Sequence, residues 1–368
     1  MLRSIYNKYR EIIITHFSNS SKAFSNEWGM KDDGVFDRFS SMIHKDCTFE
    51  RVIIELEPSE KIFKWVGAQI LNKSIFGIPN DENRILKLNQ KISYIDLESE
   101  GNFKWTGGCV WQDKVYCFPR SACSFLVISE NTAIEEPLKI KYIGEHHYAG
   151  VCSKEGIVYQ PPRNTDHILR TDLRTMKCKK IYIVADKFRI KLRYCGSIIH
   201  PNGYIYFFPE TNNRVIKLNP ITDEWCFIGA KISTMCFDAK IGIDGNIYGF
   251  CGDGKGIMKI DVYNDKTTIV HEEIVPYAYG TKYGCDGLLY SIPGKGRWIY
   301  RFDIINDTVE KFIDLHDSDE VKYAGGVTTS DGDIYFIPAQ TKNIMMLKAK
   351  SKYCIADDIY DTFFKDFY

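Results

Sequence analysis

A short apolar run with an aromatic residue near its middle recurs along the chain. Ser74–Pro79, Lys114–Pro119 and Asp333–Pro338 are three of its copies. Short apolar runs bounded by turn-forming residues are typical of β-strands. The central aromatic residues of the seven copies are Phe76, Tyr116, Tyr159, Tyr206, Tyr248, Tyr290 and Tyr335. Successive copies are therefore 40 to 47 residues apart.

Each copy is preceded by a second aromatic residue, 11 or 12 positions upstream. In four copies an Asn-Gly or Asp-Gly pair such as Asp244-Gly245 stands between the two aromatics. These pairs favour hairpin turns, because Asn, Asp and Gly tolerate positive φ. Further strands are predicted downstream, as at Ile257–Asp261 and Glu310–Leu315. The upstream aromatics, which we expect to pack between successive repeats, are Trp65, Trp105, Tyr148, Tyr194, Phe237, Tyr279 and Tyr323.

Four short strands in a repeat of this length are typical of a β-propeller blade. We therefore predict an all-β protein with seven four-stranded blades in a ring, because stacking around an axis covers the faces that one blade cannot bury. The last repeat has a third strand at Ile344–Lys348 but no fourth. Residues 51–57 match the fourth strand at Val309–Leu315 and are predicted to complete the last blade, which would close the ring.

The predicted propeller occupies residues 47–350, between two shorter segments. In residues 1–46, apolar residues such as Leu2, Ile5 and Tyr9 recur near helical spacing, which predicts a helical N-terminal extension. Residues 351–368 form a C-terminal tail, for which a short helix is one option. We expect both segments to cover the surface of the ring. The alternative is a partner surface, with residues 1–46 as the contact of a homodimer.

The repeat resembles the broad superfamily of seven-bladed propellers that includes NHL-repeat proteins, Kelch proteins and streptogramin lyases. The resemblance covers residues 50–350 and is carried by the blade pattern, for example Asp244–Tyr248 and Ile257–Asp261. It implies the propeller fold. For the streptogramin lyases it also implies an enzyme that uses His, Glu and a divalent metal near the axis, although no residue of this chain is matched to those roles. Function has to be argued from the site, because many functions share this fold.

Composition narrows the class of protein. The 48 Lys and Arg balance the 48 Asp and Glu, which disfavours a nucleic-acid binder, since such proteins depend on neutralising phosphates. No apolar run is long enough for a transmembrane helix, and no signal peptide is evident. The 12 cysteines include no Cys-x-x-Cys, and Cys117, Cys226 and Cys251 lie in apolar strand-like runs, as reduced buried cysteines do. We therefore expect a cytoplasmic protein without nucleic-acid or membrane partners.

Candidate ligand-binding residues gather in the loops that enter the first strand and leave the second strand of each repeat. In a propeller these loops surround the axial opening. A cationic ring there would attract anionic groups, and arginine can hold a carboxylate or phosphate with two hydrogen bonds. The alternative is that these charged residues recur only because the sequence repeat recurs, and that they pair with acidic residues of neighbouring blades. The candidates are Lys64, Lys104, His147, Arg193 and Lys322 before the first strands, and Arg120, Arg163 and Arg297 after the second strands.

A second candidate site is the segment Glu145-His146-His147, joined by His316 or His167 from other loops. Imidazole and carboxylate groups ligate Zn²⁺ and other divalent ions, and a histidine can act as a general base. Adjacent strand residues point to opposite sides, so His146 and His147 are not expected to share one ion. No cofactor is predicted. A divalent metal at His146 and His147 is the alternative.

The pattern favours a binding module that recognises a peptide, a protein segment or an anionic small molecule around the axial opening. The alternative is a propeller enzyme, a metal-assisted lyase or hydrolase, that uses Glu145, His146, His147 and His316. Gly252–Gly256 resembles a phosphate loop, but it joins two predicted strands and is interpreted as a hairpin. Residues that break the repeat are further site candidates: Trp111, Pro161–Arg163, Asp238 and Trp298.

Overall fold

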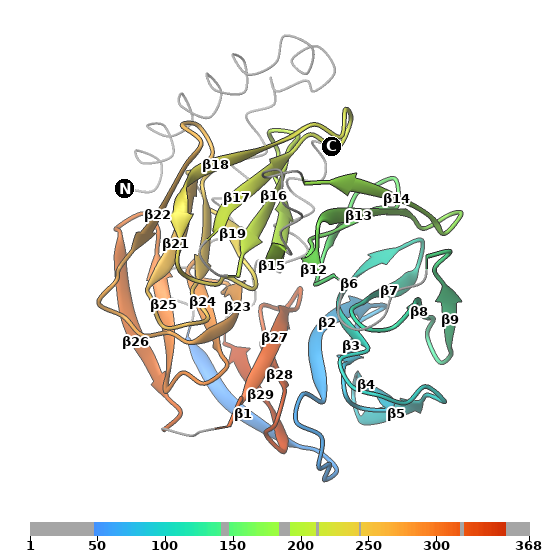
Figure 1. The fold of residues 1–368 in the computed structure, drawn as a ribbon. Coiled ribbons are helices and arrows are strands. Elements are labelled where there is room, and N and C mark those ends of the chain that lie inside the picture. The colour runs from blue at the N-terminus through green and yellow to red at the C-terminus, as the bar shows by residue number, and fades with distance from the viewer. Residues whose placement is uncertain are drawn as a thin grey trace, which may run out of the picture.

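Seven antiparallel sheets surround a central axis (Figure 1). The computed structural model describes residues 48–140, 147–183, 192–210, 213–242, 244–316 and 320–350, and within these ranges every residue lies in a strand, a turn or a loop. The prediction of an all-β, seven-bladed β-propeller is confirmed. The predicted N-terminal extension, residues 1–46, and the tail, residues 351–368, lie outside the described ranges.

Blades 1 to 3 follow one another in chain order, and the first strand of each lies nearest the axis. From the axis outward, blade 1 consists of β2 (Trp65–Leu71), β3 (Ser74–Pro79), β4 (Arg84–Leu88) and β5 (Ile92–Asp96). Blade 2 consists of β6 (Trp105–Trp111), β7 (Lys114–Pro119), β8 (Ser124–Ile128) and β9 (Ala133–Pro137). Blade 3 consists of β10 (Val151–Cys152), β11 (Ile157–Gln160), β13 (His167–Asp172) and β14 (Lys177–Tyr182).

Blade 4 departs from the pattern, because β12 (Arg163–Thr165), from the loop of blade 3, pairs with its inner strand. The other strands of blade 4 are β15 (Leu192–Ile199), β16 (Ile205–Pro209), β17 (Asn213–Leu218) and β18 (Trp225–Ile232). Blade 5 consists of β19 (Lys240–Ile241), β20 (Ile247–Phe250), β21 (Ile257–Asp261) and β22 (Lys266–Val270). Blade 6 consists of β23 (Ala278–Tyr283), β24 (Leu289–Pro293), β25 (Trp298–Asp303) and β26 (Thr308–Asp314).

Blade 7 joins the two ends of the propeller. Its inner strands are β27 (Tyr323–Thr328), β28 (Ile334–Pro338) and β29 (Asn343–Ala349), and its outer strand is β1 (Phe49–Glu55). β1 pairs with β29 in register from Phe49↔Ala349 to Glu55↔Asn343. The predicted closure is therefore confirmed, with the strand beginning and ending two residues earlier than expected. The ring of Phe49 also meets Tyr290 and Phe312 of blade 6 edge to face, at centroid distances of 5.5 Å and 6.4 Å.

The hairpin between the first and second strands has two lengths. Blades 1 and 2 use two-residue turns, and both residues of Asn72-Lys73 have positive φ, which matches the twist of the flanking strands. Blades 3 to 7 have three-residue loops, each ending in a glycine with φ between 75° and 85°. This confirms the turns predicted from the Asp-Gly and Asn-Gly pairs. The glycines are Gly156, Gly203, Gly245, Gly287 and Gly332.

The second strands carry the core between neighbouring blades. Six of the seven central aromatics are buried, and Tyr335 is half-buried. Cations of the third strands lie over these rings, as Lys87 does over Phe76 and Lys259 over Tyr248. The alkyl stems of such residues add packing while the charged heads reach a neighbouring blade. Lys87, for example, donates to the backbone carbonyl of Glu130 in blade 2 at 2.7 Å.

The cysteines depart from the expectation that all are reduced. Nine described cysteines are free, and Cys117 and Cys251 are buried as predicted, whereas Cys226 is exposed. Cys285 is disulfide-bonded, and its partner lies outside the described part of the chain. The prediction is therefore wrong for Cys285, because a lone cysteine in a sequence carries no sign of what the fold brings next to it. Cys285 packs against Phe49 and Ala349, at the point of ring closure.

No helix of the described part of the chain is long and apolar enough to cross a membrane.

We predict that Phe49→Ala destabilises the protein by about 2 kcal/mol, since a half-buried ring leaves its contacts with Tyr290 and Phe312. Urea unfolding measures the change. Ile53→Ala in the same strand is the control, because Ile53 is 40% exposed, and it should shift stability much less. Equal shifts in the two variants would contradict the closing role given to Phe49.

We also predict that Cys285 resists alkylation by iodoacetamide in the denatured, unreduced protein and is found in a cross-linked peptide by mass spectrometry. A reductant should release it. The nine free cysteines are the internal control, because they should be alkylated without reductant. A Cys285 peptide that is alkylated before reduction would refute the disulfide.

Candidate functional site

The strand registers align the seven inner strands residue by residue. As the reference position of each inner strand we take the residue that pairs with the central aromatic. In blade 1 this is Gln69, which pairs with Phe76, and in blade 5 it is Lys240, which pairs with Tyr248. Four residues earlier in every blade lies a residue that is at most 4% exposed. We call this the wedge position, since it is buried within the blade stack. Its occupants are Trp65, Trp105, His147, Tyr194, Cys236, Ala278 and Tyr323.

Three of the upstream aromatics therefore do not lie where the repeat predicts. Tyr148, Phe237 and Tyr279 follow the wedge position by one residue, and in a strand the next side chain points to the opposite face. The seven aromatics therefore do not share one position, although Phe237 and Tyr279 still pack between blades 5 and 6. A signal was present in the sequence: these aromatics precede the central aromatic by 11 residues in blades whose hairpin is one residue longer. We call the residue after the wedge the axial position; its occupants are Val66, Thr106, Tyr148, Cys195, Phe237, Tyr279 and Ala324.

The axial residues gather at the mouth of the ring. The rings of Tyr148 and Phe237 lie 5.9 Å apart, and those of Phe237 and Tyr279 lie 4.7 Å apart. Tyr279 packs in turn against a cluster that includes Val66 and Ala324 of blades 1 and 7. All three aromatics are half-buried, so part of each side chain is exposed to solvent.

Two further aromatics and one arginine complete a circle around the axis. Phe63 and Phe103, which precede the inner strands of blades 1 and 2, lie 6.1 Å apart. The guanidinium of Arg120 lies 4.4 Å from the centre of Phe103 and 5.2 Å from that of Tyr148. Phe63 belongs to the same cluster as Tyr279. The axial aromatic circle thus consists of Phe63, Phe103, Tyr148, Phe237 and Tyr279, each partly exposed.

The side of the circle over blades 3 and 4 carries charge. β12 places Arg163 directly opposite Arg193, and both donate to Glu210: Arg163 at 2.7 Å, and Arg193 at 2.9 Å to the other carboxylate oxygen. Arg163 also lies 5.0 Å from the centre of the Tyr148 ring. We call Arg120, Arg163 and Arg193, with Glu210, the arginine pole. Burial raises the pKa of the Tyr148 phenol against the opposing effect of the arginines, so the phenol is neutral at pH 7.

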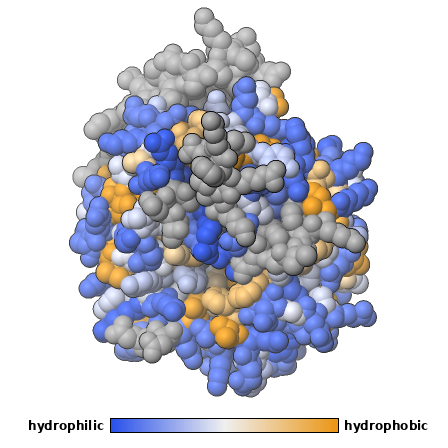
Figure 2. All heavy atoms as spheres, in the orientation of Figure 1, coloured by the Kyte–Doolittle hydropathy of each residue, from blue (hydrophilic) through white to orange (hydrophobic). Residues whose placement is uncertain are grey.

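The next side of the ring, over blades 5 and 6, carries two aromatic rings that lie against glycines of the neighbouring loops. Gly252 and Gly294 occupy the loop positions that Arg120 and Arg163 hold in blades 2 and 3. A Cβ on Gly252 would lie 2.5 Å from the Phe237 ring, and one on Gly294 would lie 2.7 Å from Tyr279. The glycines therefore let these rings lie flat on the loops. In Figure 2 hydrophobic residues gather just below the middle of the face, over β2 and β27 of blades 1 and 7, with hydrophilic residues around them.

Three lysines predicted for anion binding make contacts between blades. The Lys64 ammonium donates to the carbonyls of Gln340 and Thr341 in blade 7, at 2.9 Å and 2.6 Å. Lys104 donates to the carbonyl of Glu82 in blade 1 at 2.9 Å. Lys322 donates to that of Gly296 in blade 6 at 3.3 Å. These lysines are at most 6% exposed, and burial lowers the pKa of Lys64 and of Lys104.

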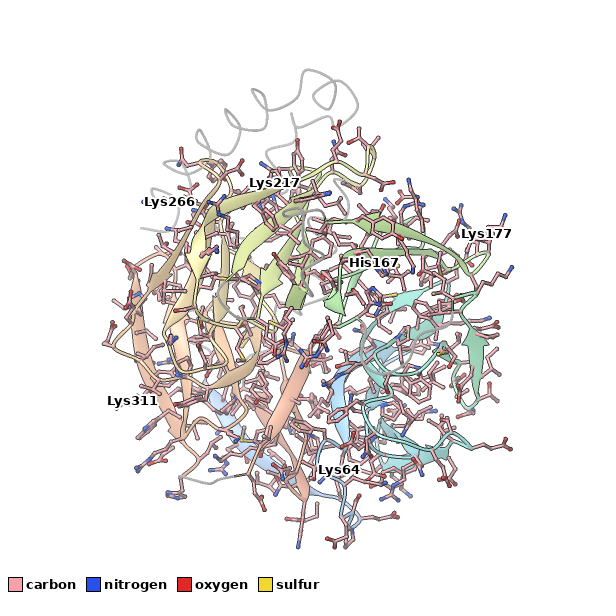
Figure 3. All side chains as sticks on the ribbon, in the orientation of Figure 1. Lys64, His167, Lys177, Lys217, Lys266 and Lys311 are labelled. Carbon is pink, nitrogen blue, oxygen red and sulfur yellow. The ribbon has the colours of Figure 1, made fainter. Side chains whose placement is uncertain are left out.

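The histidines do not gather in one place. His147, at 2% exposure, fills the wedge position of blade 3 and meets the ring of His167 at 5.2 Å. His167 shares a hydrogen bond of 2.9 Å with Asp166. Figure 3 shows His167 in blade 3 and Lys64 in a different blade at the start of β2, while Lys177, Lys266 and Lys311 lie toward the periphery. His316 has an 87% exposed side chain beside Asp314 in blade 6.

Among the described residues, no group of three or more His, Cys, Asp or Glu is placed to hold a metal ion. Glu145 and His146 lie outside the described ranges, so a metal or catalytic role for them stays a prediction. Arg297 forms an ion pair of 2.7 Å with Asp314 on the outer part of blade 6, away from the axial aromatic circle. The enzyme alternative therefore stays a prediction as well.

Asp238, another residue that breaks the repeat, lies next to Phe237. The other six blades have Gly or Ala at this position. Its carboxylate forms an ion pair of 2.5 Å with Lys282 and lies 3.9 Å from Lys240, and these lysines lower the pKa of Asp238. This ion cluster links the inner strands of blades 5 and 6 beneath the aromatic side of the mouth.

No family model matches the chain, and no curated protein matches it. Solved structures share its fold. A streptogramin B lyase superimposes with a TM-score of 0.67 at 15% identity, covering 82% of this chain and 98% of that one. A catalytically inactive histidine-to-alanine variant of virginiamycin B lyase from Staphylococcus aureus, solved with quinupristin, gives 0.65 at 17% identity, covering 81% and 99%. The WD40 propeller domain of Doa1 gives 0.59 at 11% identity, covering 84% and 99%. These likenesses establish the propeller fold alone.

We predict that His167→Gln reduces the loss of stability between pH 7 and pH 5. Burial lowers the pKa of His167 in the folded protein, against the opposite effect of Asp166, while an unfolded histidine titrates near about 6.5. Between these values the unfolded chain binds more protons, so stability falls as the pH drops below the unfolded pKa. Urea unfolding at the two pH values measures this. Ile221→Ser is the control, since it changes a 74% exposed side chain without a titratable group and should keep the pH dependence of the unchanged protein.

Proposed function

We propose that the axial mouth is a binding site for a ligand that joins an anionic group to an apolar, preferably planar, group. The observation that carries this proposal is the juxtaposition of the axial aromatic circle with the arginine pole. Five partly exposed rings surround the axis, and Tyr148 links them to Arg120 and Arg163. A clustered surface of this kind, formed where the repeat is broken, is typical of a ligand site.

Each half of the site suits one half of such a ligand. Phe237 and Tyr279 pack against each other and together can cover one side of an apolar group, and an aromatic contact contributes about 0.5–1.5 kcal/mol beyond the area buried. Arginine binds carboxylate and phosphate with paired, charge-assisted hydrogen bonds. Glu210 holds Arg163 and Arg193 in fixed orientations before a ligand arrives, which lowers the entropy lost on binding.

This proposal assigns anion binding to the arginines of the predicted cationic set. Lys64, Lys104 and Lys322 already donate to backbone carbonyls of neighbouring blades. Their contact with a ligand stays a prediction on which the proposal does not depend. The same holds for His147, which is buried at the wedge position, and for Arg297 on the outer part of blade 6.

The experiment uses 8-anilinonaphthalene-1-sulfonate, an aromatic anion whose fluorescence reports binding. The folded protein should bind one equivalent. Phe237→Ala and the double variant Arg163→Gln/Arg193→Gln should each weaken the affinity about tenfold, which corresponds to about 1.4 kcal/mol. The first change removes the ring at the centre of the apolar half, and the second removes two cations but keeps their polar side chains.

Two matched variants serve as controls. Tyr182→Ala removes an aromatic that is 53% exposed on β14, and Arg174→Gln removes an arginine paired with Asp172 on the outer part of blade 3. Both should retain the affinity of the unchanged protein. Thermal unfolding confirms that each variant is folded. If the dye binds with equal affinity to all the variants, or does not bind to the folded protein, the proposal is wrong.

A further inference from the structure

The apolar half of the mouth continues outward over blade 6. Tyr277 is 40% exposed and Val275 is 49% exposed, and both lie in the segment that leads into β23. Tyr277 has a φ of 40°, so the chain turns just before β23 and does not run extended from Tyr277 to Tyr279. Val275 and Tyr277 adjoin Phe237 through one loop, because Gly254 lies against Val275 and Tyr277 while Gly252 lies against Phe237.

The loop beneath this surface is rich in glycine for a steric reason. A Cβ on Gly252 would lie 2.5 Å from Phe237, and a Cβ on Gly254 would lie 2.9 Å from Val275 and 3.0 Å from Tyr277. The loop therefore supports the apolar side chains from below. This accounts for Gly252–Gly256 without a phosphate: the segment is a connection between β20 and β21, as predicted.

The surface has opposite chemistry at its two ends. One end is the arginine pole, where three arginines and one carboxylate stand together among the described residues. The other end is formed by two exposed apolar side chains over blade 6. A compact small molecule would occupy the mouth alone. A chain of residues, at about 3.3 Å per residue, is the kind of ligand that also covers Tyr277 and Val275.

We infer that the ligand is a linear peptide segment of a partner protein, with an acidic residue at the arginine pole and apolar residues over Phe237, Tyr279, Tyr277 and Val275. This inference rests on the proposed function, because it uses the same mouth, and it adds the ligand class and its direction. Charge complementarity sets the direction. The apolar strip supplies most of the area removed from water.

The probe is a random dodecapeptide library displayed on phage, selected against the full chain. Enriched sequences should pair an acidic residue with apolar or aromatic residues a few positions away. A synthetic peptide of the leading sequence should bind about tenfold more weakly to Val275→Ser/Tyr277→Ser and to Arg163→Gln/Arg193→Gln. The matched controls are Ile221→Ser, which changes a 74% exposed side chain outside the mouth, and Arg174→Gln, and both should keep full affinity.

Peptide substitutions give the direction. Replacing the apolar residues of the peptide by serine should weaken binding to the unchanged protein. The same replacement should weaken binding to Val275→Ser/Tyr277→Ser little further, because this variant already lacks the contacting side chains. If the naphthalene sulfonate binds at the mouth but the library yields no enriched sequence, the peptide inference is wrong and the proposed function stands. If enriched peptides bind all variants equally, the inference is also wrong. If neither probe binds, both proposals fall.

Discussion

The inner strands of neighbouring blades come so close at the axis that their backbones touch. A Cβ on Gly325 would lie 2.9 Å from the Cα of Gly67, and a Cβ on Gly107 would lie 2.8 Å from the Cβ of Ala149. Gly67, Gly107 and Gly325 have positive φ, which leaves β-bulges in these strands. In most blades no residue larger than glycine or alanine fits at the position of Gly67, Gly107 and Gly325. The residue just before this position, at the axial position, is therefore the one that reaches the mouth.

The same crowding separates the repeated scaffold from the site. On the side of blades 7, 1 and 2 the axial residues are the small Ala324, Val66 and Thr106, and the neighbouring lysines bind carbonyls across the blade boundaries. On the side of blades 3, 5 and 6 the axial residues are aromatic and the lysine contacts are replaced. Features that recur in every blade hold the ring together. Features that break the repeat form the proposed ligand site.

Much of the architecture follows from local chemistry in the chain. The strands Ser74–Pro79 and Lys114–Pro119 were predicted to the residue, because apolar alternation and turn-forming residues mark their ends. The closing strand was found within two residues, since its pattern matches β26. Arg120 and Arg163 were identified as candidates because they follow second strands. Phe237 and Tyr279 were assigned to packing, because their one-residue shift appears only when hairpin lengths are compared.

By itself, the sequence determined the number of blades, the strands within them, the turn types and the closure, because these depend on periodicity and on pairing between neighbours in the chain. Tertiary structure alone decided which side chains meet. Arg163 and Arg193 converge on Glu210 because β12 leaves its own blade, and Cys285 packs against Phe49 and Ala349 because the closing strand passes beside it. Contacts of this kind depend on distances across the axis and between blades, and no local pattern of residues encodes those distances.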